Sequence, residues 1–353
     1  MQFGLWVEPE GVSRDSAMFR EHPQWVMGVP ALAQPRGRRQ HVLNLGLEAA
    51  REHVFQQPSA LLRSAPIGFL KWDMNRDMAH AAGPMGAAAV HQHVQGWYAL
   101  FDALRSAFPA LEIETCASGG ARADLGMLQR ASRVWVSDCN DPSERQRMQR
   151  ALLGFLPPEV MGVHTGDARS HTTGRIADMP LRTLNALFGH VGIEADVMQI
   201  SQDDARHLQQ AIAVYKSERH WLHVAQVTPL ENPDPAPLAT SAIAADDQRA
   251  LVSMVAVGRT RDAVPAALRV QGLAANDLHR INTHKLWSPP PTIGKATAGM
   301  FQSGNGVLLP GLALQYGGLA LPILHPGSGI LLSVERHGCR TRAHRLPKPD
   351  RCD

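Results

Sequence analysis

The sequence has few of the features that mark membrane, nucleic-acid-binding or disulfide-rich proteins. Its 353 residues include only four cysteines, and aromatic residues make up 5% of the chain. The formal net charge is +3, which is too small to indicate a nucleic-acid or membrane partner. No apolar run approaches the roughly 20 residues of a membrane-spanning helix. A soluble globular protein is expected, and a hydrophobic content of 44% is enough for a sizeable core.

Metal-binding and signal-peptide patterns are also missing. The cysteines are Cys116, Cys139, Cys339 and Cys352. Their spacing is not of a metal-binding type. His91 and His93 lie two apart in an expected helix, where such side chains diverge. We therefore expect no metal ion and no cofactor. Residues 1–5 show no basic region before an apolar core, so a cytoplasmic protein with free thiols is expected.

What the sequence does have is an alternation of strand-like and helix-like segments through residues 1–225. Examples are the apolar run Ile67–Leu70 and the amphipathic segment Val90–Phe108. Such alternation predicts an α/β fold with parallel strands.

The composition and the residue pattern of the sequence change after residue 225. Residues 226–240 are rich in proline and predict a linker. Residues 241–335 have β-type patterns, including an expected hairpin over 319–334. Residues 336–353 are rich in arginine and proline and predict a disordered tail.

Polar side chains gather where three of the predicted strands end. These ends are Lys71–Arg76, Glu114–Gly120 and Trp135–Asp141. In a βα-barrel the carboxyl ends of the strands carry the chemistry. A single strand-end aspartate usually caps a helix or lies in solvent, but three such ends in succession favour a functional site. Asp141, followed by Pro142 and Glu144, has the pattern of a helix N-cap, which leaves Asp138 available for function.

Four stretches together carry a resemblance to a known family. They are Gly4–Glu10, Leu70–Arg76, Cys116–Gly120 and Trp135–Asp138. In order and spacing they resemble successive strand-end motifs of glycoside hydrolase family 36, the melibiase-type α-galactosidases. The resemblance runs from about Phe3 to about Glu335. It implies a (β/α)8 TIM-type barrel followed by a small C-terminal antiparallel β-sandwich. It also implies that this chain holds barrel strands 3–8 and lacks the family's N-terminal β-domain and first two strands.

The same resemblance implies an activity and a set of site residues. The activity is retaining hydrolysis of terminal α-galactosides, such as melibiose and raffinose-type oligosaccharides, by double displacement. Asp73 matches the nucleophile and Asp138 the acid/base residue of that mechanism. The residues that match sugar-binding positions are Trp6, Arg38, Lys71, Trp72, Asn75, Cys116, Ser118 and Gly119. Lys71 and Asn75 are expected to hold Asp73 ionised, and Trp6 to supply a flat apolar wall. Family homologues oligomerise through the N-terminal domain that this chain is expected to lack.

Three alternatives stay open on the sequence. A raffinose-synthase-like galactosyl transferase uses the same two carboxylates with an acceptor sugar in place of water. A non-catalytic galactoside binder or an inactive fragment is the second alternative, and the intact Asp73 and Asp138 count against it. A metal-dependent hydrolase ranks last, because no ligand triad with suitable spacing is present. The carboxylates of Glu8 and Glu10, outside these readings, are expected in a solvated turn.

Overall fold

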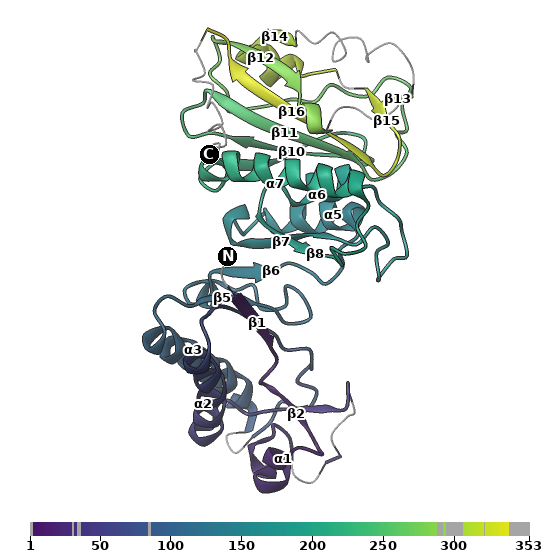
Figure 1. The fold of residues 1–353 in the computed structure, drawn as a ribbon. Helices are drawn as coiled ribbons and strands as arrows, with labels where there is room; N and C mark the ends of the chain where they lie inside the picture. Colours follow the sequence, from purple (N-terminus) through teal and green to yellow (C-terminus); the bar gives the residue numbers. More distant parts are fainter. Residues whose placement is uncertain are drawn as a thin grey trace, which may run out of the picture. The chain divides into compact units, whose positions relative to one another are not determined.

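The computed structural model describes residues 3–29, 32–33, 37–83, 86–287, 292–293, 306–320 and 322–338. The chain forms two compact units, residues 1–178 with 185–201, and residues 179–184 with 202–353 (Figure 1). Most of the tail that the sequence predicts to be disordered, with Cys339 and Cys352, lies outside the described residues. Of the helices that the structure describes, none is both long enough and apolar enough to span a bilayer.

A six-stranded parallel sheet organises the first unit. In spatial order its strands are β1 (Phe3–Val7), β4 (Ile67–Trp72), β5 (Glu112–Thr115), β6 (Arg133–Trp135), β7 (Met161–Gly166) and β8 (His190–Glu194). Every neighbouring pair is parallel, as in a βα-barrel. The expectation of a partial TIM-type barrel is confirmed by this order. Within the described residues, β1 and β8 each pair on one side only.

Helices and short strands complete this part of the chain. They are α1 (Ala17–Glu21), α2 (Glu48–Ser64), α3 (Ala89–Ala107), α4 (Leu125–Leu128), α5 (Pro142–Leu152) and the antiparallel pair β2 (Gly11–Ser13) and β3 (Gln40–Val42). Helix α6 (Met179–Ala186) belongs mostly to the second unit. The predicted apolar face of α3 is buried and packs on the sheet, where the Phe101 ring lies 5.0 Å from that of Trp72. Asp141 caps α5, and its side chain accepts a hydrogen bond from the Ser143 N–H, so the N-cap prediction is confirmed.

The second unit is built on an antiparallel sheet. In spatial order its strands are β14 (Val307–Pro310), β12 (Leu278–Thr283), β16 (Ser328–Arg336), β11 (Arg249–Ala256), β10 (Pro237–Ile243) and β9 (Gln226–Leu230). A further pair joins β13 (Thr292–Ile293) to β15 (Ile323–Leu324). Helix α7 (Gln202–Leu222) runs beside this sheet (Figure 1), with the Arg249 guanidinium 4.6 Å from the Trp221 ring. The expectation of an antiparallel C-terminal β-domain is confirmed.

Three details of this unit differ from the sequence expectations. The supposed linker at 226–240 holds β9 and the start of β10, which pair with each other. Prolines are tolerated there because β9 is an edge strand and Pro237 is the first residue of β10. The described residues of 319–334 do not form the expected hairpin, since β15 pairs with β13 whereas β16 pairs with β11 and β12. Helix α7, expected within the barrel segment, groups with the antiparallel sheet.

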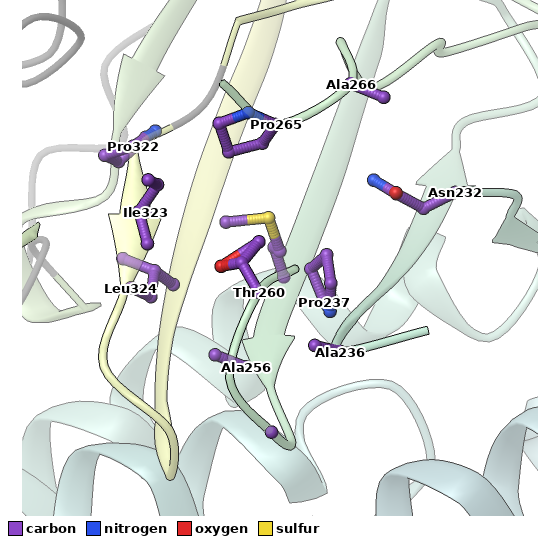
Figure 2. Close-up of a pocket in the computed structure, with 12 residues that line it drawn as sticks. Asn232, Ala236, Pro237, Ala256, Thr260, Pro265, Ala266, Pro322, Ile323 and Leu324 are labelled. Carbon is purple, nitrogen blue, oxygen red and sulfur yellow. The ribbon is translucent and has the colours of Figure 1, made fainter. Parts of the chain in front are cut away.

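A small pocket lies in the core of the second unit (Figure 2). Its lining is mainly apolar, with Pro237, Met254, Ile323 and Leu324 among the contributing side chains. The free volume is about 20 Å³, which is enough for roughly one water molecule. Ligand sites for small molecules usually offer about 300–1,000 Å³, so this pocket is a packing feature and not a sugar site.

Candidate active site

Asp73 stands directly after β4, at the carboxyl end of the parallel sheet. Its backbone N–H donates to the Val7 carbonyl at 2.9 Å, which ties it to the end of β1. Four donors reach its carboxylate: Trp6 Nε1 at 3.1 Å, Asn75 Nδ2 at 2.7 Å, the Met74 N–H at 2.8 Å and the thiol of Cys116. The side chain is almost entirely buried.

These donors fix the charge of Asp73. Burial by itself raises the pKa of a carboxyl group. The hydrogen bonds, from Cys116 first and then from Asn75 and Trp6, outweigh burial and hold the pKa of Asp73 below its usual value. Asp73 is therefore an oriented carboxylate anion at neutral pH, which is the state that a nucleophile needs.

Asp138 follows β6, two strands along the sheet, and unlike Asp73 it is exposed. Its Oδ1 accepts a hydrogen bond from Trp135 Nε1 at 2.7 Å. Cys116, at the end of the intervening β5, hydrogen-bonds to Asp73 and has its sulfur 4.0 Å from Asp138 Oδ1. Burial, with the nearby Asp73 carboxylate, raises the pKa of Cys116, so the group between the two acids is a neutral thiol.

The loop after β5 brings backbone close to these carboxylates. Ser118 is exposed, and its Oγ donates to Asn75 Oδ1 at 3.2 Å, which orients the amide that reaches Asp73. Gly119 has φ +91°, and a Cβ there would lie 2.9 Å from the Cα of Ser137. Only glycine satisfies both conditions, so a side chain is excluded from this floor.

The remaining residues expected in the site differ in their exposure and in their contacts. Trp6 is half exposed beside Asp73. Arg38 is exposed in a turn with φ +48°. Lys71 contacts Glu114, at 3.7 Å, and the Trp135 ring, at 4.1 Å. Trp72 is fully buried, and its Nε1 donates to Glu10. Successive residues of a strand face opposite sides, and Trp72 faces the core; a sugar-binding role for it stays a prediction.

Several residues of the site were missed or misjudged from the sequence. Glu8 Oε1 accepts the N–H of Asn75 at 2.9 Å, and Glu10 is completely buried, so neither carboxylate belongs to a merely solvated turn. The His164 ring on β7 packs at a tilt of 40° against Trp135, with ring centroids 4.0 Å apart. In the sequence, the one sign that Glu8 and Glu10 belong to the site is that both acids closely follow Trp6 at a strand end.

Glu194, at the end of β8, adds a further carboxylate to the polar side chains near Trp135. It accepts hydrogen bonds from His164 Nδ1 at 3.1 Å and Asn140 Nδ2 at 2.7 Å. The hydrogen bond from His164 is the main reason that the pKa of Glu194 falls to about 2. In the portion of the chain that the structure describes, no cluster of His, Cys, Asp or Glu side chains is arranged to hold a metal ion. The chemistry that these residues themselves offer is that of two carboxylates with distinct surroundings.

Comparison with known proteins decides the family. The model of the Melibiase family matches residues 1–225. The chain belongs to the melibiase family. This range contains the whole parallel sheet and both carboxylates described above.

Relatives and solved structures agree with this membership. The melibiase-family chain is 36% identical over 342 residues to an α-galactosidase of Escherichia coli, and 33% identical over 291 residues to the α-galactosidase AgaA of Geobacillus stearothermophilus. A variant of AgaA in complex with raffinose superposes with a TM-score of 0.84 at 30% identity, over 95% of this chain.

The alignments cover most of this chain but less than half of each relative. The two alignments cover 95% and 80% of this chain, but 48% and 39% of the E. coli and AgaA sequences. The structural match likewise covers 45% of the AgaA chain. The chain therefore spans less than half the length of these relatives.

Proposed function

We propose that the protein hydrolyses terminal α-galactosyl residues from α-galactosides with retention of configuration. The observation that carries the proposal is the pair Asp73 and Asp138, set at strand ends with the Cys116 thiol against both. Retaining hydrolysis requires two carboxyl groups on opposite sides of the anomeric carbon, separated by about 5–5.5 Å. One of them must be ionised, and the hydrogen bonds around Asp73 support that state.

The roles follow from the surroundings of the two groups. Asp73 attacks the anomeric carbon, and Asp138 gives its proton to the glycosidic oxygen as that bond breaks. The galactosyl group is then an ester of Asp73. Asp138, now a carboxylate, takes a proton from water, which attacks the same carbon and releases Asp73. Exposure of Asp138 supports this second step, because its side chain is accessible to water.

Binding of the sugar is proposed to involve the groups around Asp73. The half-exposed indole of Trp6 offers a flat apolar surface, and Asn75, Ser118 and Arg38 offer polar groups for hydroxyls. The relatives' structures with raffinose and stachyose support α-galactosides as the substrate class. A cytoplasmic location stays a prediction of the sequence.

The experiment is proton NMR of the first-formed sugar during hydrolysis of an aryl α-galactoside. The full chain is assayed alone and also placed behind the N-terminal region of the E. coli relative. Retention predicts that α-galactose appears first and then mutarotates. β-Galactose as the first product would refute the mechanism, and absence of turnover in both forms would refute the function. Transfer of galactose to added sugar at the expense of hydrolysis would favour the transferase alternative.

A further inference from the structure

A buried arginine lies behind the exposed carboxylate of the site. Arg145, on α5, is completely buried, and its Nη1 donates to the carbonyl of Ser137 at 3.1 Å. Its guanidinium carbon is 4.5 Å from the centre of the Trp135 ring. Its Nε and Nη2 have no hydrogen-bond partner among the residues that the structure describes. A buried, incompletely paired cation is costly, so Arg145 is a candidate for a role beyond packing.

Charged and titratable groups approach this arginine from every neighbouring element. Glu114 on β5, Asp138 and Cys139 after β6, and Glu194 on β8 interact electrostatically with Arg145. Lys71 on β4 and His164 on β7 lie against the Trp135 ring that Arg145 also contacts. Burial lowers the pKa of Arg145 to about 10, and the neighbouring anions oppose that fall. Arg145 is therefore a cation at neutral pH.

Arg145 contacts two groups that in turn hold Asp138. The first is the Trp135 ring, whose Nε1 donates to Asp138 Oδ1 at 2.7 Å. The second is the Ser137 carbonyl, which belongs to the residue before Asp138. A guanidinium can stack on an indole and hydrogen-bond in its own plane at once, whereas an ammonium group cannot. Arg145 can thus fix both the indole and the backbone that aim the acid.

We propose that Arg145 is a positioning residue for Asp138, acting through Trp135 and the Ser137 carbonyl. The inference rests on the proposed function. Proton donation matters most when the leaving group is a poor one, such as a sugar alkoxide, and least for an activated phenolate. Disturbing Arg145 should therefore weaken turnover of natural galactosides more than that of activated aryl galactosides.

The test compares Arg145→Lys, Arg145→Met and Trp135→Phe in whichever form of the full chain is active. Trp135→Phe keeps a ring but removes the indole N–H donor to Asp138. We expect kcat/KM for raffinose to fall about 10- to 100-fold in each, with a clearly smaller loss for a nitrophenyl galactoside. Combining Arg145→Lys with Trp135→Phe should cost less than the product of the single losses, since both act on one contact. Arg147→Lys, on the same helix but exposed, is the matched control and should change neither rate.

A pH profile supplies a readout that a purely structural role would not move. Removing the buried positive charge in Arg145→Met favours the protonated acid, so the alkaline limb of the rate profile should shift to higher pH. Arg145→Lys keeps the charge and should shift less. Equal losses on both substrates, or an unmoved alkaline limb in Arg145→Met, would overturn the inference. If the Arg145 variants do not fold, equal losses in Trp135→Phe would overturn it alone. An inactive wild-type protein would refute the proposed function, and this inference with it.

Discussion

The carboxylate of Glu10 is completely buried beside the parallel sheet, where several donors converge on it. Glu10 Oε1 accepts hydrogen bonds from Trp72 Nε1 at 2.8 Å, Trp97 Nε1 at 3.0 Å and Arg122 Nη1 at 2.8 Å. Its Oε2 lies 3.5 Å from His93 Nε2. The Glu10 carboxylate, in the loop after β1, thus connects this loop with strand β4, with helix α3 and with the segment before α4.

This network determines how the stability depends on pH. Burial alone raises the pKa of Glu10, but the charge of Arg122 and the hydrogen bonds of His93 and Trp72 lower it from 4.5 to about 2. A fall of that size corresponds to about 3 kcal/mol of folding free energy. Because the folded state binds the proton more weakly than the unfolded state, this stability is fully present above pH 4.5. It is lost progressively as the pH falls towards 2.

The perturbation is Glu10→Gln, which keeps the shape and removes the charge. The Leu45 N–H donates to His93 Nδ1 at 3.2 Å, so His93 Nε2 carries a proton, and this nitrogen lies 3.5 Å from Glu10 Oε2. An amide NH2 at that position would meet another donor, and Arg122 would lose its anion. Breaking a buried ion pair on one side costs about 3–5 kcal/mol, and we expect that loss at pH 7.

The assay is urea unfolding followed by tryptophan emission, with amide hydrogen exchange of α3, which carries His93 and Trp97. The difference between wild type and Glu10→Gln should be largest at pH 7. It should shrink as the pH falls from 4.5 towards 2, because the unfolded wild-type chain then takes up a proton at Glu10 that the folded chain binds only near pH 2. Glu52→Gln, the same change at an exposed position of α2, should alter stability by less than about 0.5 kcal/mol. A variant as stable as wild type at pH 7, or a difference that does not change with pH, would refute the reasoning.

Three further predictions concern the site and the sheet. Asp73→Ala should abolish hydrolysis of every galactoside, whereas Asp138→Ala should lose roughly 10²–10⁴-fold on natural sugars and much less on aryl galactosides; equal losses in steady-state kinetics would contradict the assigned roles. Gly119→Ala should lower the melting temperature more than Gly174→Ala, because both have positive φ but only at Gly119 does the added Cβ meet backbone at 2.9 Å; equal shifts would show that strain alone matters. The chain expressed alone should aggregate more than the same chain behind the E. coli relative's N-terminal region, because in the part of the chain that the structure describes β1 and β8 each pair on one side only; an equally soluble monomer would refute this.

The sequence by itself determined the elements whose causes are local. Alternating apolar segments indicated parallel strands joined by helices, and the Asp141 cap followed from neighbours within three residues. The order of four strand-end motifs indicated the family, because each motif is a short run that needs no knowledge of its partners. Asp73 and Asp138 were proposed as a pair on the same grounds.

Tertiary structure decided everything that depends on distant partners. Glu10 lies in a polar run typical of solvated turns, yet its donors are 62, 87 and 112 residues away, and they make burial of its charge tolerable. Trp72 adjoins the site in sequence but faces the core, because strand alternation alone does not say which face is which. The prolines of 226–240 indicate a linker in the sequence, but in the structure an edge strand accommodates them. In the sequence Arg145 is one of three arginines of α5, and only the packing of α5 against Trp135 sets it apart. In each case the physical reason is the same: burial and charge compensation are properties of the assembled sheet and its helices, and short stretches of sequence do not carry them.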